Sequence, residues 1–375
     1  MSRKLKKNAS QLARAGLSVG LKGCRQLNHS CPVCSIVPPH VLREIAKNGN
    51  ANQQEWAFQS LTVSSRIRGQ RDVLSNISTV MVTPAGEKRR TVYDAQNGTD
   101  LPGTLVRGEG DPATDDVAVT EAYDGAGATY DFFNEVYERN SVDDRGLRLD
   151  STVHYGENYD NAFWSGNQMV YGDGDGEIFE RFTKAIDVIG HELTHGVTQF
   201  TARLVYQGQP GALNESMSDV FGSLVKQRVL NQTAEEADWI IGEGLFTPQV
   251  QGVGLRSMKA PGTAYDDPVL GKDPQPADFK DLYKGRQDNG GVHINSGIPN
   301  RAFYLAATAM GGFAWEKAGR IWYITLRDRL RPRSDFKQGA NLTIAVAGEL
   351  YGQGSDEQKA VREAWKQVGI QPTAK

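Results

Sequence analysis

The repeat of apolar positions divides the chain into a strand-like part and a helical part. From about residue 180 onward, apolar residues return every three or four positions, and the segments with this pattern are 184–201, 212–231, 295–310, 313–330, 336–351 and 356–367. From about 91 to 175, short β-prone runs alternate with Gly, Asp and Asn, with one expected helix at Ala118–Arg139. This order predicts an α+β fold with a strand-rich lobe, a helical lobe and a cleft between them.

The front of the chain shows little of either pattern. Residues 1–35 are basic at first, then rich in Gly, Ser and Asn, and then in Cys and His, which indicates a solvated tail. After Pro38-Pro39, the residues Val41, Leu42 and Ile45 recur at helical spacing and predict a short amphipathic helix. Because this helix has no amphipathic partner nearby, we expect its apolar face to dock on the rest of the chain near the cleft.

Composition and charge exclude several classes of protein. The net charge is only −3, so nothing in it indicates binding to nucleic acid or to an anionic membrane. No segment approaches the roughly 18 apolar residues of a transmembrane helix. The basic N-terminus is also not followed by the run of about 7 to 15 apolar residues that a Sec signal requires. We therefore expect secretion by another route, with a cytoplasmic location as the alternative.

The segment His191-Glu192-Leu193-Thr194-His195 has the spacing of a metal site. Two His residues four apart on an apolar helix share one face and can bind one zinc ion, which leaves a coordination position for water. Glu192 would then be the general base for that water. The pattern is short, however, and by itself is also compatible with two unrelated His residues on a surface helix.

The next predicted helix offers a third ligand. Glu215 follows His195 by 20 residues, and the turn at 208–211 would return the helix antiparallel. Asp219, one turn after Glu215, is placed to accept the second N–H of a liganding His. A further His, His293, lies between a Gly-Gly loop and a helix start, where Asp288 could orient it, although a lone His is more often structural.

These segments together resemble the thermolysin family of zinc metalloendopeptidases, the gluzincins, from about Ala118 to the C-terminus. The motifs that carry the resemblance are Asn161-Ala162-Phe163-Trp164, Met169-Val170-Tyr171-Gly172-Asp173-Gly174-Asp175-Gly176, His191-Glu192-Leu193-Thr194-His195, Gly211-Ala212-Leu213-Asn214-Glu215, Leu255-Arg256-Ser257-Met258 and Gly290-Gly291-Val292-His293-Ile294-Asn295-Ser296-Gly297. The segment Pro38-Pro39-His40-Val41-Leu42 resembles the protealysin-like branch, which has a short propeptide.

The resemblance implies a role for each matching residue. The zinc ligands would be His191, His195 and Glu215. The catalytic residues would be Glu192 as base and proton shuttle, with His293 and Tyr206 as hydrogen-bond donors to the oxyanion. The groups that bind the substrate backbone would be Asn161, the Ala162 carbonyl and Arg256. The residues that orient His191 and His293 would be Asp219 and Asp288, respectively. The residues lining an apolar primed-side pocket would be Phe182, Val188, Ile241 and Leu255, with Phe179 nearby.

A departure from the family pattern concerns calcium. The positions that match the double-calcium site of thermolysin are Asp187, Lys226, Asp238, Ile240 and Glu243. Because Ca²⁺ takes six to eight oxygen ligands, an ammonium and an aliphatic group at two of these positions predict that the double site is absent. A calcium site elsewhere, for instance at Asp173 and Asp175, is compatible with the sequence.

The resemblance further implies a precursor with three parts, which are residues 1–85 as tail and short propeptide, 86–200 as the strand-rich lobe ending in the zinc helix, and 201–375 as the helical lobe. The expected partners are protein or peptide substrates and the chain's own propeptide. We expect a monomer that cuts peptides on the amino side of bulky apolar residues. One alternative is an inactive binding module of the same fold. Another is a zinc-binding regulator, or a thiolate cap for the catalytic zinc, formed by residues of the tail: Cys24, His29, Cys31 and Cys34.

Overall fold

The computed structural model describes residues 35–74 and 87–373, with the side chains of 65–74 excluded. The predictions for Cys24, His29, Cys31 and Cys34 therefore lie outside the described residues. None of the helices in the described part is long and apolar enough to cross a membrane.

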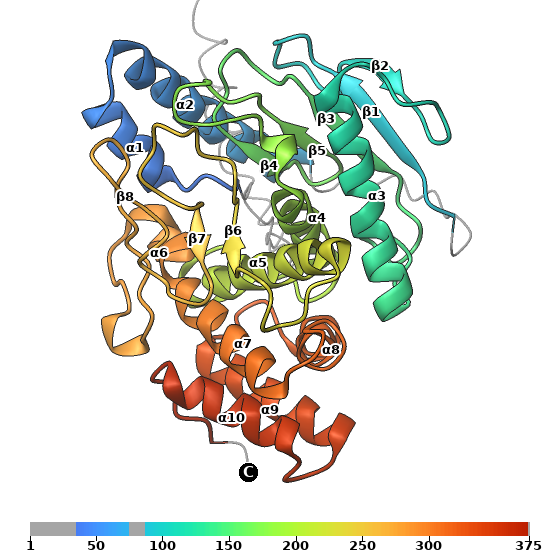
Figure 1. Ribbon diagram of the computed structural model, residues 1–375, viewed down its shortest axis with the longest axis vertical. Helices are drawn as coiled ribbons and strands as arrows, with labels where there is room; N and C mark the ends of the chain where they lie inside the picture. Colours follow the sequence, from blue (N-terminus) through green and yellow to red (C-terminus); the bar gives the residue numbers. More distant parts are fainter. Residues whose placement is uncertain (1–34, 75–86, 374–375) are drawn as a thin grey trace, which may run out of the picture. The chain divides into compact units, whose positions relative to one another are not determined.

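A five-stranded mixed sheet forms the core of the first lobe (Figure 1). Its strands are β1 (Arg90–Asp94), β2 (Thr104–Arg107), β3 (Leu149–Val153), β4 (Ala162–Trp164) and β5 (Met169–Tyr171). The spatial order is β2-β1-β3-β5-β4, with β1, β3 and β5 parallel and the two outer strands antiparallel to their neighbours. Within the sheet β4 is therefore an edge strand, and its outer side is open to pairing with another extended segment.

Two long helices connect this sheet to the second lobe (Figure 1). Helix α3 (Val117–Tyr137) packs on β1 and β3, while α4 (Ile186–Phe200) follows a short 3₁₀ turn, η1 (Phe182–Lys184), and packs on β4. Asp116 caps α3, because its carboxylate accepts hydrogen bonds from the first turn of that helix. Every residue of α4 from Asp187 to Thr198 is buried, as expected for a helix at the centre of the molecule.

Helices dominate the second lobe, at the bottom of Figure 1. They are α5 (Gly208–Leu230), α6 (Gln287–Asn295), α7 (Gly297–Met310), α8 (Ala318–Ile324), α9 (Phe336–Tyr351) and α10 (Asp356–Gln367). The short elements are β6 (Ile240–Ile241), β7 (Arg256–Ser257), β8 (Asp266–Asp267), β9 (Gly271–Lys272), the 3₁₀ turn η2 (Phe279–Asp281) and the π-helical turn η3 (Thr325–Arg329). The predicted α+β architecture of two lobes is thus confirmed.

Close contact between α4 and α5 depends on two glycines. A β-carbon on Gly190 would lie 3.0 Å from the α-carbon of Gly222, and one on Gly222 would lie 2.9 Å from the backbone nitrogen of His191. Hydrogen atoms at both positions therefore let the two backbones approach where the HExxH segment faces the helix that carries Glu215.

The helix predictions hold best in the second lobe. The predicted segments 336–351 and 356–367 coincide with α9 and α10. The predicted helix 313–330 begins later, at Ala318, because a turn follows the two left-handed glycines Gly311 and Gly312. Helix α2 (Ala51–Leu74) was not predicted from the sequence, because its apolar residues do not form one face at helical spacing.

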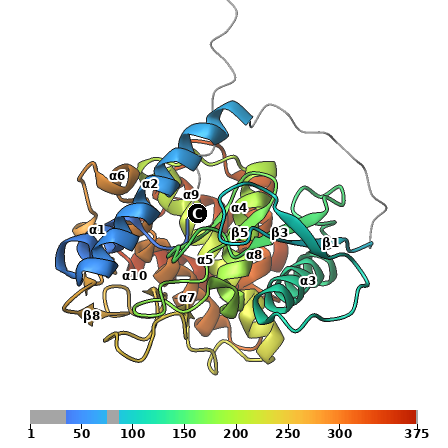
Figure 2. The same ribbon diagram turned by 90° about the horizontal axis from the view of Figure 1, so that it is seen from above.

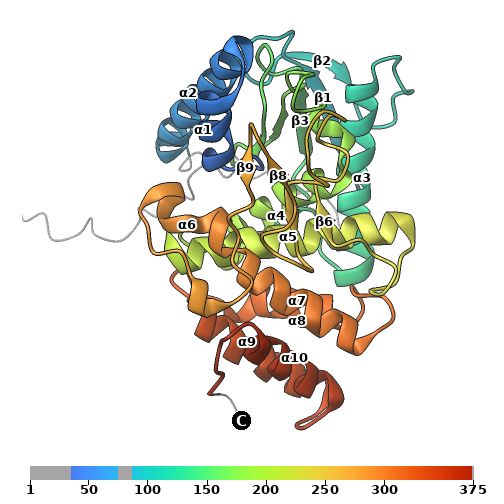
Figure 3. The same ribbon diagram turned by 60° about the vertical axis from the view of Figure 1, so that its left-hand side comes forward.

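The front helices dock on the two lobes (Figure 3). Helix α1 (Pro39–Asn48) buries Val41, Leu42 and Ile45, and it packs against both α2 and α6. Polar contacts add to this docking, since Gln53 donates to Glu177 over 2.9 Å. Figure 2 shows α1 and α2 together along one side of the body. The predicted burial of the apolar face is confirmed, but the expectation that the segment lacks a partner of its own is wrong, because α2 packs against it.

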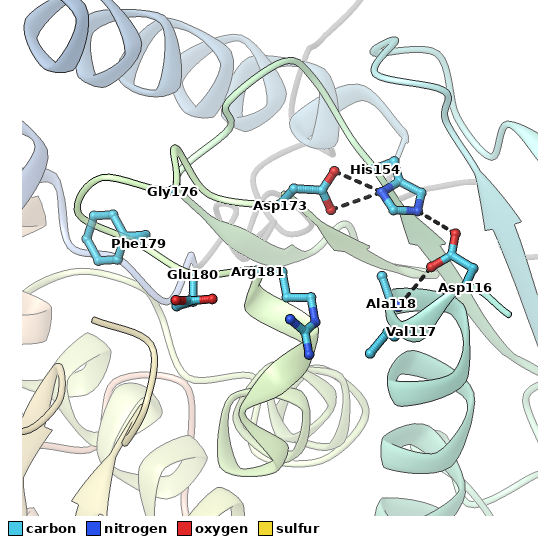
Figure 4. A pocket seen from close by; sticks show the side chains of 9 residues that line it. All are labelled: Asp116, Val117, Ala118, His154, Asp173, Gly176, Phe179, Glu180 and Arg181. Carbon is cyan, nitrogen blue, oxygen red and sulfur yellow. Dashed lines mark hydrogen bonds and ion pairs between the residues drawn. The ribbon is translucent and has the colours of Figure 1, made fainter. Parts of the chain in front are cut away.

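A cavity of about 340 Å³ lies beside the sheet, and its lining includes His154 (Figure 4). The His154 ring lies between two carboxylates, with Nε2 2.8 Å from Asp116 and Nδ1 2.8 Å from Asp173. The hydrogen bond to Asp173 foremost, and then that to Asp116, raises the pKa of His154 to about 9 against the opposing effect of burial. The charged ring therefore ties the cap of α3 to the loop after β5.

Replacing His154 by Asn should make folding stability less dependent on pH. Asn tolerates the left-handed backbone of this position, where φ is 54°. Because protonation is favoured in the folded chain, the His154 contribution is complete below about pH 6.5 and is lost as pH rises through about 9. Urea unfolding should show a wild-type advantage below pH 6.5 that shrinks above pH 9. An advantage that stays constant over this range would contradict the ion-pair explanation.

Candidate metal centre

Two imidazoles and one carboxylate converge between α4 and α5. His191 and His195 on α4 and Glu215 on α5 offer ligand atoms that all lie within 4.8 Å of one another. The Nε2 atoms of the two His residues are 3.0 Å apart, and each lies 3.5 Å from a Glu215 oxygen. All three side chains are buried.

The other ring nitrogen of each His is held by a neighbour on α5. Nδ1 of His191 donates to Asp219 over 2.7 Å, whereas Nδ1 of His195 lies 3.0 Å from both Asn214 and Ser218. Such contacts fix the tautomer in which Nε2 carries a lone pair for a metal. Burial raises the pKa of Asp219, but Arg256 and His191 outweigh it and lower this pKa to about 2, so the carboxylate is ionised.

The donor set fits zinc. Two imidazole nitrogens and one carboxylate oxygen are the ligands of a catalytic zinc site with one position left for water. Oε2 of Glu215 is buried and accepts no hydrogen bond, although a carboxylate oxygen without a partner is costly in the interior. A cation at this point would satisfy it, together with the two facing imidazole nitrogens.

Glu192 lies next to the ligands without joining them. Its Oε2 accepts a hydrogen bond of 2.9 Å from the backbone nitrogen of Trp164 on β4, while its Oε1 is buried without a hydrogen-bond partner. Burial raises the pKa of Glu192 to about 8, and the positive charge of a bound metal would lower it again. A carboxylate poised near neutral pH suits a general base.

Two further side chains that can donate hydrogen bonds, His293 and Tyr206, lie beside Glu215. His293 is held by Asp288, which accepts from its ring Nδ1 over 2.6 Å and from its backbone nitrogen over 2.8 Å. Four successive residues at the start of α6 are left-handed. Asp288 and Asn289 have φ of 53° and 50°, and Gly290 and Gly291, where this backbone has no steric cost, have φ of 81° and 78°. The Tyr206 hydroxyl lies 3.1 Å from Nε2 of His293 and donates to Glu215.

The predicted substrate-binding groups lie along the same cleft. Asn161 and Ala162 are at the open edge of β4, and Arg256 on β7 faces them while pairing with Asp219 over 2.8 Å. The four apolar residues Phe182, Val188, Ile241 and Leu255 are all buried and belong to the main hydrophobic core. The hydrogen bonds and ion pairs of the structure bring the predicted polar site residues together around the metal centre, whereas for the four apolar residues they establish burial only.

Family models match nearly the whole of the folded part. The catalytic domain of thermolysin metallopeptidases matches residues 71–199, and their alpha-helical domain matches residues 202–370. The chain belongs to the thermolysin metallopeptidase family. It is therefore a metalloprotease, a hydrolase that acts on peptide bonds, of a family that uses catalytic zinc.

Individual relatives place this thermolysin-type protease in the protealysin-like branch. It is 50% identical over 354 residues to an extracellular metalloprotease of Pectobacterium carotovorum, spanning 91% of this chain and 98% of the relative. It is 52% identical over 345 residues to Protease PrtS of Photorhabdus, spanning 89% and 91%. A solved structure, the precursor of protealysin from Serratia proteamaculans, superposes with a TM-score of 0.83 at 56% identity, over 90% of this chain and 99% of that chain.

Sequence reasoning missed several residues that support the ligands of this metallopeptidase. Asn214 comes directly before Glu215 and Ser218 follows it by three residues on the same helix, so their sequence positions could have indicated that they lie near the ligands. Asn300, which donates to Asp219 over 2.8 Å, comes from α7, and nothing in the local sequence links the two.

Asp219→Asn should weaken zinc binding by about 10–100-fold, because the amide cannot hold the His191 ring as the carboxylate does. Competition with a chromophoric chelator measures the change. The matched control is Asp288→Asn, which alters the orientation of His293 but touches no ligand and should leave zinc affinity unchanged. Equal effects of the two substitutions would contradict the assigned support of His191.

Proposed function

We propose that this protein is a zinc-dependent neutral endopeptidase made as a precursor, in which Glu192 is the general base. The observation that carries the proposal is the convergence of two imidazoles and a carboxylate beside an unpartnered Glu192 oxygen, at the open edge of β4. The alternative of an inactive binding module has no such support, because each residue that hydrolysis requires is present.

When bound by His191, His195 and Glu215, zinc supplies a Lewis acid for the substrate carbonyl and lowers the pKa of a bound water to about 7. Glu192 is the base that would take a proton from the attacking water and pass it to the amine that leaves. His293 and Tyr206 donate hydrogen bonds to the carbonyl oxygen as negative charge develops on it. For this, the Tyr206 hydroxyl turns from Glu215 toward the substrate.

The primed side of the cleft accepts a bulky apolar side chain in this proposal. The predicted pocket residues Phe182, Val188, Ile241 and Leu255 are apolar and buried, so a charged side chain would lose its hydration there without gaining a partner. Asn161, Ala162 and Arg256 hold the substrate backbone as an added strand beside β4.

The precursor is latent because its own front segment fills the cleft. Residues 1–85 serve as tail and propeptide, 86–200 as the strand-rich lobe with the zinc helix, and 201–375 as the helical lobe. Relatives that bear the name extracellular support export. The protein acts as a monomer on protein or peptide substrates, without nucleic acid or membrane as partner.

The zinc-loaded chain, once trimmed, should cut a peptide library on the amino side of bulky apolar residues, read out by mass spectrometry of the products. Glu192→Ala should abolish cutting and keep the same zinc content by elemental analysis, because Glu192 is not a ligand. Preference for Asp or Lys after the cut would refute the pocket assignment, and metal loss in Glu192→Ala would refute the role of the base.

Calcium has no place at the double site in this proposal. Nζ of Lys226 lies 2.6 Å from Asp238, 2.9 Å from Glu243 and 3.9 Å from Asp187, where thermolysin has metal. Asp187 is buried, and burial raises its pKa to about 6 although Lys226 opposes this rise. The ammonium therefore supplies the positive charge that neutralises this cluster.

Thermal unfolding of the trimmed enzyme should be the same with and without calcium, using a chelator too weak to remove zinc. Lys226→Met should destabilise the protein by about 3–5 kcal/mol, because it leaves the buried Asp187 charge uncompensated. The control is Lys272→Met, at an exposed lysine of β9, with a negligible effect. A steep fall in melting temperature on calcium removal would show that Lys226 does not replace the metal.

A further inference from the structure

Residues Ser35 to Val37 lie as an extra strand against the open edge of β4. Ser35 pairs with Phe163 in antiparallel fashion, and the Ile36 nitrogen donates to the Ala162 carbonyl over 3.1 Å. Val37 exchanges two hydrogen bonds with the Asn161 side chain, of 2.9 Å and 3.2 Å. All three residues are buried, so this contact is part of the folded core.

Each carbonyl of this strand has a defined partner, and together the partners fix its register. The Ser35 carbonyl accepts from Nε2 of His293 over 3.2 Å, and the Ile36 carbonyl accepts from Nη1 of Arg256 over 3.1 Å. The Val37 carbonyl is held by Asn161. Of the three, only the Ser35 carbonyl therefore lies at the donor that faces the zinc ligands.

We propose that the bond between Ser35 and Ile36 is a cleavage site for the chain's own active centre, cut within one molecule. This inference rests on the proposed function. Hydrolysis consumes one water, whose hydroxyl adds to the Ser35 carbonyl carbon while a proton passes by way of Glu192 to the Ile36 nitrogen. The carbon–nitrogen bond breaks, which leaves a carboxylate at Ser35 and an amine at Ile36.

Neighbouring bonds are excluded by the same register. The Ile36–Val37 bond has its carbonyl on Arg256, away from His293 and the zinc ligands. The Val37–Pro38 bond has its carbonyl on the Asn161 amide and has no N–H on the side that leaves. Ile36 fully buries its apolar side chain immediately after the proposed cut, where the proposed specificity requires a bulky apolar residue.

This cut detaches residues 1–35 without opening the cleft. Ile36 and Val37 keep their bonds to Ala162 and Asn161, and the chain that follows is anchored by α1. Helix α2 adds contacts to the same lobe, since Ser60 accepts from the Asp160 nitrogen over 3.1 Å and Ser64 lies 3.2 Å from Tyr159. The clipped chain is therefore a stable product complex that stays latent until the rest of the propeptide is removed.

The test starts from the full precursor purified in chelator, with excess zinc added at time zero and samples taken for intact mass and N-terminal sequencing. The first new species should begin at Ile36 and should form at a rate independent of protein concentration. It should appear before activity on an added peptide. Glu192→Ala precursor should stay uncut.

Two variants separate recognition from misfolding. Ile36→Asp should slow this cut by at least about 10-fold, because a carboxylate enters an apolar site. Ile36→Leu is the matched control and should restore it, and near-ultraviolet circular dichroism should report the same fold in both. Equal cutting of the two variants would overturn the proposal.

The outcomes also separate this inference from the proposed function. If the trimmed enzyme cuts added peptide but no species beginning at Ile36 ever forms, the self-cleavage proposal fails and the protease assignment stands. A rate that rises with protein concentration overturns cleavage within one molecule. If zinc-loaded protein cuts neither itself nor the peptide, both proposals fail.

Discussion

One buried carboxylate, that of Asp219, holds side chains from three separate elements at the candidate metal centre. Its two oxygens accept hydrogen bonds from His191 on α4, from Arg256 on β7 and from Asn300 on α7. An ion removed from water costs several kcal/mol unless partners compensate it, so these three elements must converge for the charge to be tolerated. As a result, the orientation of the His191 ring, which binds zinc in the proposed function, and that of the Arg256 guanidinium are set by the same group.

In the proposed function, the same logic explains how the front segment and a substrate can bind to the same groups in turn. The backbone-binding groups of Asn161, Arg256 and His293 are buried, and a buried polar group that loses its partner costs about 1–3 kcal/mol. Residues 35–37 satisfy all three. Any peptide that replaces them must offer an amide and carbonyls in the same places, so latency and recognition draw on one set of hydrogen bonds.

The sequence predicted much of the architecture because periodicity and spacing are local signals. Segments 336–351 and 356–367 have clear apolar faces and coincide with α9 and α10. Helix α2 was not predicted, because its apolar residues are spread around the helix and it docks on residues distant in sequence, such as Tyr159. The ligand set followed from one motif and its spacing to Glu215, whereas Asn300 could not be predicted, since only the tertiary fold brings α7 to Asp219.

The front helices α1 and α2 belong to the same polypeptide as the two lobes on which they dock, and this covalent connection has a consequence for regulation. A segment tethered in the same chain faces its groove at an effective concentration that reaches the millimolar range for short linkers, so even weak intrinsic affinity keeps the groove filled. Once the tether is severed, the same contacts must compete at the actual concentration of the free fragment. If the proteins are dilute, the fragment escapes, whereas in a crowded compartment it can rebind. Dilution by itself would then act as the trigger that releases activity.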